Sequence, residues 1–110
     1  MNQTLPQSEH LKRQRDFKSV ISKGNSKKLD YAKIYGHSKR DGQSKIGLIV
    51  GKKVGIAPYR NRVKRLWKEA FRLVRQDFQQ PMDLVVKIYP NYRLKHLDDL
   101  KHSIMELEKC

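Results

Sequence analysis

A row of basic side chains between residues 58 and 78 carries the clearest chemistry in the sequence. Nine of the residues from 51 to 75 are Lys or Arg, and Glu69 is the only acid among them. Guanidinium groups are planar and bond two phosphate oxygens at once, which suits arginine to nucleic-acid backbones. The segment therefore predicts binding of a polyanion, through Asn61, Lys64, Arg65, Lys68, Arg72 and Arg75.

Helical geometry brings these six residues together. At about 100° per residue they fall within an arc of roughly 100°, opposite the apolar side chains, and Arg60 and Arg62 flank the boundary. The two arginines also lie in the first helical turn, where the helix dipole disfavours cations. Phosphate binding would explain both features. The alternative is a solvated basic face that serves solubility.

A second group of candidate residues lies on a predicted strand, residues 29–38. Alternation places Tyr31, Lys33, Tyr35 and His37 on one face and Ala32 and Ile34 on the other. Aromatic rings beside cations suit single-stranded RNA, because bases stack while phosphates pair with charge. The alternative is that the tyrosines pack beneath a helix.

Charge over the whole chain agrees with a polyanionic partner. The 110 residues carry a net charge of +14 with a pI of about 10.1. Residues 76–110 are close to neutral, so the charge gathers in the N-terminal part and the central segment. Nucleic acid and an anionic membrane surface are the partners that fit. No stretch approaches the roughly 18 apolar residues of a membrane span.

Other chemistries find little support. The four histidines have neither cysteine partners nor metal-ligand spacing. Asp98 and Asp99 point about 100° apart on a helix, so they suit a helix N-terminus better than a shared ion. Cys110 is the only cysteine, so no disulfide within the chain is expected, and residues 1–7 have no apolar core like that of a signal peptide. We expect a cytoplasmic protein with no catalytic group and no metal site of its own.

The elements that must hold these residues can be read from periodicity. Residues 10–23 predict a helix that stops at Gly24, with Phe17, Val20 and Ile21 at helical spacing. The strand 29–38, a turn at 40–42 and a strand at 44–50 predict a hairpin. A further short strand is possible at 26–29.

The second half of the chain alternates between helix and strand. Apolar residues predict a helix over 58–78, with Pro58 in its first turn, although Ala57 is a poor N-cap. Residues 83–89 predict a strand in a central or parallel position, and 97–107 a final helix. The fold class is α+β, a small two-layer α/β sandwich of three helices and about four strands in a mixed sheet. We expect a polar arm at 1–9 and a single domain over 10–110.

These residues resemble the protein component of bacterial ribonuclease P. The resemblance rests on Gly47 to Gly55 with its Lys52-Lys53 pair, on Arg60-Asn61-Arg62-x-Lys64-Arg65, and on Glu69-Ala70-Phe71-Arg72. Upstream, Leu11-Lys12-Arg13-x-x-Asp16-Phe17 resembles the start of the first helix of that family. The match covers about residues 11–107.

The resemblance implies a subunit of a ribonucleoprotein endonuclease that removes the 5′ leader from precursor tRNA. Chemistry would belong to the RNA subunit and its Mg²⁺, and the polypeptide alone would not be catalytic. A left-handed crossover through the long helix is also implied. The catalytic RNA would contact Arg60, Asn61, Arg62, Lys64, Arg65, Lys68 and Arg72. The single-stranded leader would lie in a cleft lined by Phe17, Ile21, Tyr35 and Lys53.

The sequence also departs from the family pattern. Gly51 and Ile56 stand where Ser and Asn are usual, and Ile21 replaces a common second aromatic. A non-catalytic RNA-binding protein, such as a ribosomal or assembly factor, is the alternative function. A duplex-DNA binder is disfavoured, because half of the long helix is apolar and no dimer element is evident.

Overall fold

The computed structural model describes residues 14–40, 42–93 and 95–108. Three helices and four strands follow in the order α1 (Gln14–Lys23), β1 (Asn25–Lys28), β2 (Ala32–Ser38), β3 (Ile46–Val50), α2 (Ala57–Val74), β4 (Met82–Ile88) and α3 (Leu97–Glu108). Short 3₁₀ turns, η2 (Lys52–Val54) and η3 (Arg75–Asp77), flank α2. The predicted α+β class, element order and short extra strand are confirmed. The arm at 1–9, Asp41 and Cys110 lie outside the described residues.

The sheet order is β1-β2-β4-β3, with β3 and β4 parallel and the other pairs antiparallel. The predicted hairpin of β2 and β3 is therefore wrong, because β4 lies between them. Leu84, Val85 and Val86 are each fully buried, so β4 is apolar on both faces. The centre of the sheet is the position that removes both of its faces from water.

The loop between β2 and β3 is tied to the start of β4 instead of closing a hairpin. The Lys45 N–H donates to Asp83 Oδ1 at 3.0 Å, and the Met82 N–H donates to Ser44 Oγ at 2.9 Å. Lys39 Nζ lies 3.0 Å from the same Asp83 oxygen. These contacts satisfy polar groups where the chain passes the start of β4.

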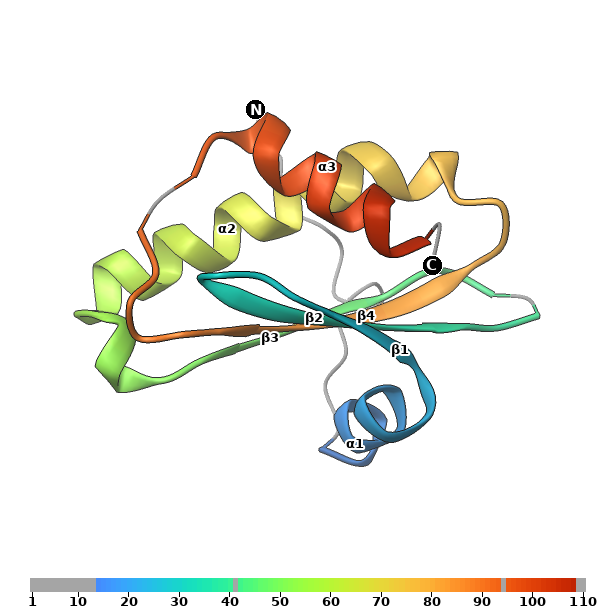
Figure 1. Cartoon of the computed structure of the whole chain (residues 1–110), viewed down its shortest axis with the longest axis horizontal. Helices are drawn as coiled ribbons and strands as arrows, with labels where there is room; N and C mark the ends of the chain where they lie inside the picture. Colours follow the sequence, from blue (N-terminus) through green and yellow to red (C-terminus); the bar gives the residue numbers. More distant parts are fainter. Residues whose placement is uncertain (1–13, 41, 94, 109–110) are drawn as a thin grey trace.

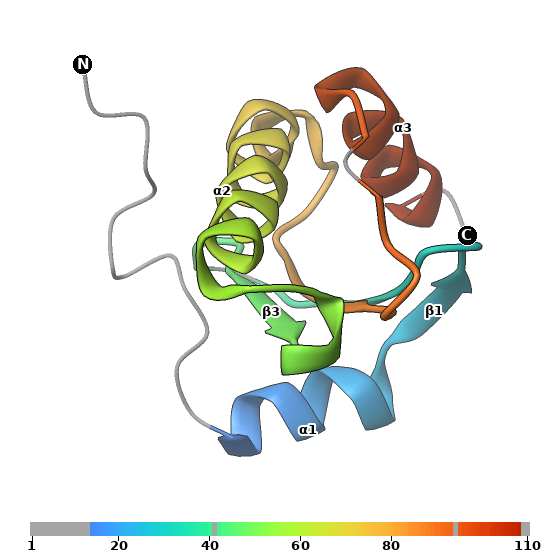
Figure 2. The same cartoon turned by 90° about the vertical axis from the view of Figure 1, so that its left-hand side faces the viewer.

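Helices cover the two faces of the sheet unequally (Figure 1). α2 and α3 lie side by side on one face, and α1 lies alone on the other. Viewed with β3 pointing toward the reader, the chain rises into α2 and returns as β4 on the side nearer β1 (Figure 2). This β3–α2–β4 crossover is left-handed, whereas about 98% of crossovers between parallel strands are right-handed.

The main core lies between the sheet and the pair α2 and α3. Trp67 and Phe71 of α2, and Leu100 and Ile104 of α3, are fully buried there. α2 ends earlier than the predicted residue 78, but Phe78 still packs its ring against Phe71, with 6.1 Å between the ring centroids. Within the described part of the chain, no helix is long and apolar enough to cross a membrane.

The end of α1 lies very close to the backbone of β2 on the other face of the sheet. A Cβ on Gly24, directly after α1, would collide with the carbonyl oxygen of Gly36 in β2. The Gly24 N–H donates to Val20 O at 2.9 Å, which closes the last turn of the helix. Glycine is thus required at the predicted stop signal because any side chain would push α1 off the sheet.

Candidate nucleic-acid interface

The outer surface of α2 presents the predicted cations in one row. Asn61, Arg62 and Arg65 are exposed, and Lys64 and Lys68 are half-buried. On the opposite side Val63, Trp67 and Ala70 are fully buried, as the apolar spacing predicted. The helix is therefore fixed by its apolar side while its cations face outward, which is the arrangement that a phosphate backbone needs.

Arg60 differs from Arg62 although both stand in the first turns of α2. Its Nε donates to the carbonyl oxygen of Gly55 at 3.0 Å, so the guanidinium is tied to the preceding loop. Arg62 is exposed. Arg60 is thus held in place partly by protein, and only the end of its guanidinium remains to contact a ligand.

Arg72 is paired within the helix. Its Nε and Nη2 donate to the two carboxylate oxygens of Glu69 at 2.9 and 2.6 Å. The hydrogen bond from Arg72 lowers the pKa of Glu69 from its ordinary value, and the same bond raises the pKa of Arg72. Arg75 lies beyond α2, in η3. Among the described residues, no acidic side chain pairs with the cations from Arg62 to Lys68, and these form the cation row of α2.

Lys68 is the cation with the least favourable surroundings. Partial burial, and then the charge of Lys64, lower its pKa from the ordinary value of 10.5. Both effects disfavour the charged form in the free protein. A phosphate beside Lys68 would reverse them, because an opposite charge favours the ammonium.

The face of the sheet that carries α1 brings Phe17 and Tyr35 together. Both pack against a small cluster formed by buried Val20 and Val85, joined by half-buried Ile49. Ile21 is 37% exposed and lies outside this cluster. Lys53 is exposed on η2, which reaches the same side of the sheet as α1 at the other end of the strands (Figure 1).

Tyr31 does not share this face. It precedes β2 and packs against the main core, with its ring edge-to-face to Tyr92 at 5.6 Å and its hydroxyl 3.5 Å from Ser103 Oγ of α3. The predicted grouping of Tyr31 with Tyr35 is wrong. Strand alternation holds only from Ala32, where β2 begins, so the position of Tyr31 cannot be extrapolated from it.

The register of the sheet reveals a row of lysines that the sequence did not indicate. Lys28 is directly opposite Lys33, and Lys33 is directly opposite Lys87, so the three lie in line across β1, β2 and β4. Lys33 Nζ also lies 5.2 Å from the centre of the Tyr35 ring. Like charges directly opposite destabilise a sheet. Strand pairing was the missing signal, since β4 is distant from β2 in sequence.

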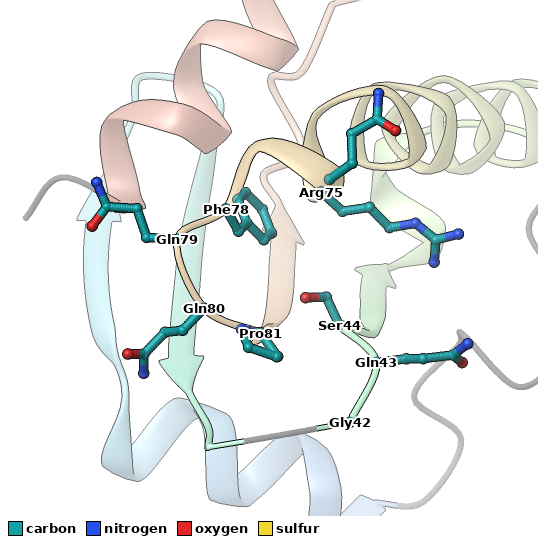
Figure 3. Close-up of a pocket in the computed structure, with 9 residues that line it drawn as sticks. Gly42, Gln43, Ser44, Arg75, Phe78, Gln79, Gln80 and Pro81 are labelled. Carbon is teal, nitrogen blue, oxygen red and sulfur yellow. The ribbon is translucent and has the colours of Figure 1, made fainter.

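A pocket lies at the other end of α2, and Arg75 is the one charged residue among its lining residues that the structure describes. Phe78 and Pro81 lie near its centre, whereas Gln79 and Gln80 extend away from it (Figure 3). Among the described residues, no three His, Cys, Asp or Glu side chains gather closely enough to hold a metal ion. The positively charged surfaces remain the functional candidates, and they lie on α2 and on the α1 face of the sheet.

Known proteins share both the sequence pattern and the fold. The family model described as Ribonuclease P matches residues 5–110. The "Ribonuclease P protein component" of Dictyoglomus thermophilum is 36% identical over 95 residues, which is 86% of this chain and 79% of that protein. The protein of the same name from Clostridioides difficile is 36% identical over 100 residues, covering 90% and 88% of the two chains.

Solved structures agree with the fold. The ribonuclease P protein of Staphylococcus aureus has a TM-score of 0.74 at 22% identity, covering 92% of this chain and 93% of that chain. The protein from Thermotoga maritima has a TM-score of 0.73 at 23% identity, covering 93% and 97%. Because the family model matches almost the whole chain and these relatives are 36% identical, the chain belongs to the bacterial ribonuclease P protein family, as a protein component of ribonuclease P.

Proposed function

We propose that this protein binds both the catalytic RNA of ribonuclease P and the 5′ leader of precursor tRNA, and that the complex hydrolyses the phosphodiester bond at the mature 5′ end in the cytoplasm. The observation that carries this proposal is the separation of two cationic surfaces. One is the outer side of α2, and the other is the α1 face of the sheet with its lysine row.

The outer side of α2 suits a folded RNA. Arg62, Lys64, Arg65 and Lys68 project from a helix whose other side is locked into the core, so they can bind phosphates without the helix moving. Because the helix is already fixed, less conformational entropy is lost when an RNA binds. We assign the contact with the catalytic RNA to this surface, including Arg60, Asn61 and, beside its Glu69 partner, Arg72.

The α1 face suits a single strand. The rings of Phe17 and Tyr35 can stack on bases. Lys33 lies two residues before Tyr35 on β2, directly opposite Lys87 of β4. Lys53 is exposed on η2, which follows β3. Stacking is tolerant of sequence because every base has a π face. We assign the leader to this face, with Ile21 at its border.

Chemistry is proposed to reside in the RNA and its bound Mg²⁺. The residues of this chain would neutralise phosphates, orient the leader and hold precursor tRNA against the RNA. Lower repulsion between the RNA and its substrate reduces the cation concentration that the reaction needs.

The test is cleavage of a precursor tRNA by a bacterial ribonuclease P RNA at low Mg²⁺, with and without the protein. We expect strong stimulation at the mature 5′ end and no cleavage by the protein alone. Failure to stimulate an RNA that is active at high Mg²⁺, with the protein folded, would overturn the proposal and favour a non-catalytic RNA-binding role.

A further inference from the structure

Three successive exposed apolar residues stand at the start of α2. Ile56, Ala57 and Pro58 are all exposed, and Ile56 is 74% accessible. The other exposed large apolar side chain among the described residues, Ile21, is 37% accessible. We call residues 56–58 the apolar tip. A run of exposed apolar residues is unfavourable on a surface unless it has a binding role.

The loop that carries the apolar tip is held by contacts of its own residues with the core and with α2. Val54 is buried in the main core, and the Val54 N–H donates to Gly51 O at 3.1 Å. Gly55 lies so close to Tyr59 that an added Cβ would be 2.7 Å from its ring. Val54 and Gly55 thus anchor the loop to the rest of the protein, while Ile56 stays exposed.

Arg60 closes the same loop from the helix side. Its Nε binds Gly55 O at 3.0 Å, and its backbone N–H donates to Ile56 O at 2.9 Å. Ile56 is therefore presented to solvent from a prearranged backbone. A ligand that covers Ile56 gains the apolar contact, and little conformational entropy is lost because the loop is already in place.

Charge selects the kind of ligand. Lys52, Lys53 and Arg62 are exposed around the apolar tip, and the chain has no acidic residue from position 51 to 68. The tip is also continuous with the cation row of α2. An unpaired nucleotide combines an apolar base face with an anionic phosphate, and RNA displays such bases in loops and bulges. Apolar side chains are known to wedge against bases in nucleic acids.

We propose that the apolar tip is a contact for an unpaired nucleotide of the ribonuclease P RNA. Ile56 covers the face of the base, and the neighbouring cations bind the phosphates on either side of it. The inference deepens the proposed function, because it names what the first turn of α2 recognises beyond phosphate charge.

The test compares Ile56→Ser with Arg62→Gln in the full chain, using the ribonuclease P RNA as the probe and measuring Kd over a series of salt concentrations. Loss of an apolar contact should raise Kd roughly five- to tenfold at every salt concentration. Loss of a phosphate contact should lower the slope of log K against log salt by about 1. Ile56→Ser should leave that slope unchanged.

Gln80→Ala is the control, because Gln80 is exposed in the loop between η3 and β4, far along the chain from the apolar tip. Unchanged circular dichroism would show that each variant folds. A Kd for Ile56→Ser within twofold of the unmodified protein would overturn the apolar contact, as would a change in slope equal to that of Arg62→Gln. Failure of the unmodified protein to bind this RNA would instead overturn the proposed function.

Discussion

The two faces of the sheet differ in how much apolar surface they bury. Under α2 and α3 the core runs without a break from Trp67 and Phe71 to Leu84 and Ile104. Under α1 only Val20 and Val85 are buried among the described residues of that cluster, while Phe17, Tyr35 and Ile49 remain partly accessible. The first face supplies stability, and the second leaves aromatic rings and lysines available to a ligand.

The largest expected effect contrasts two phenylalanines. Phe71→Ala removes a fully buried ring beside Phe78 and should lower the free energy of unfolding by about 3–5 kcal/mol. Phe17→Ala removes a half-buried ring and should cost much less. Urea denaturation of both variants measures the difference. Equal losses would show that the α1 face is as structural as the main core.

Two tyrosines separate stability from binding. Tyr31→Ala should lower the free energy of unfolding by about 2 kcal/mol, because Tyr31 packs against Tyr92 and the main core. Tyr35→Ala should weaken binding of precursor tRNA to the holoenzyme by about 1–3 kcal/mol, the value of one stacked base. Mature tRNA, which has no leader, is the control substrate. If Tyr35→Ala weakened both substrates equally, the leader would not lie on this face.

The row of Lys28, Lys33 and Lys87 should lower the stability of the free protein and strengthen its binding to precursor tRNA. Lys87→Gln relieves repulsion from Lys33, directly opposite, and should raise the free energy of unfolding by about 0.2–0.5 kcal/mol. The same change should weaken precursor binding and reduce its salt dependence. Lys101→Gln on α3, on the other side of the sheet, removes an equal charge and serves as the control. Identical binding losses in both variants would indicate a general charge effect.

The smallest effect concerns Lys68 on the outer side of α2. Because burial and Lys64 lower its pKa, the ammonium costs free energy in the folded protein below that pKa. This loss of stability disappears as the pH rises through the lowered pKa of the folded protein toward 10.5, the ordinary lysine pKa. Lys68→Gln should therefore stabilise the free protein slightly at neutral pH and weaken RNA binding, whereas Lys68→Arg should preserve binding. Thermal denaturation and the RNA Kd measure the two effects, and a destabilised Lys68→Gln would contradict the first.

Much of the cationic surface of α2 could be predicted before the structure. Helical spacing in residues 58–78 separates cations from apolar residues, and α2 places Asn61, Lys64, Arg65 and Lys68 as expected. Local periodicity succeeds here because neighbours on a helix are three or four residues apart in sequence. The Glu69 pair with Arg72 also follows this spacing, although its bidentate geometry needed side-chain positions.

Sequence by itself determined the charge distribution, the type of each element and the burial of β4, because these depend on composition and local period. Tertiary structure decided which strands pair. The placement of β4 between β2 and β3 removed the expected hairpin and aligned Lys33 with Lys87. Tyr31, which precedes β2, packs against the main core. Strand pairings join residues far apart in the chain, and a local pattern can indicate that a strand is buried on both faces but not which strands lie beside it.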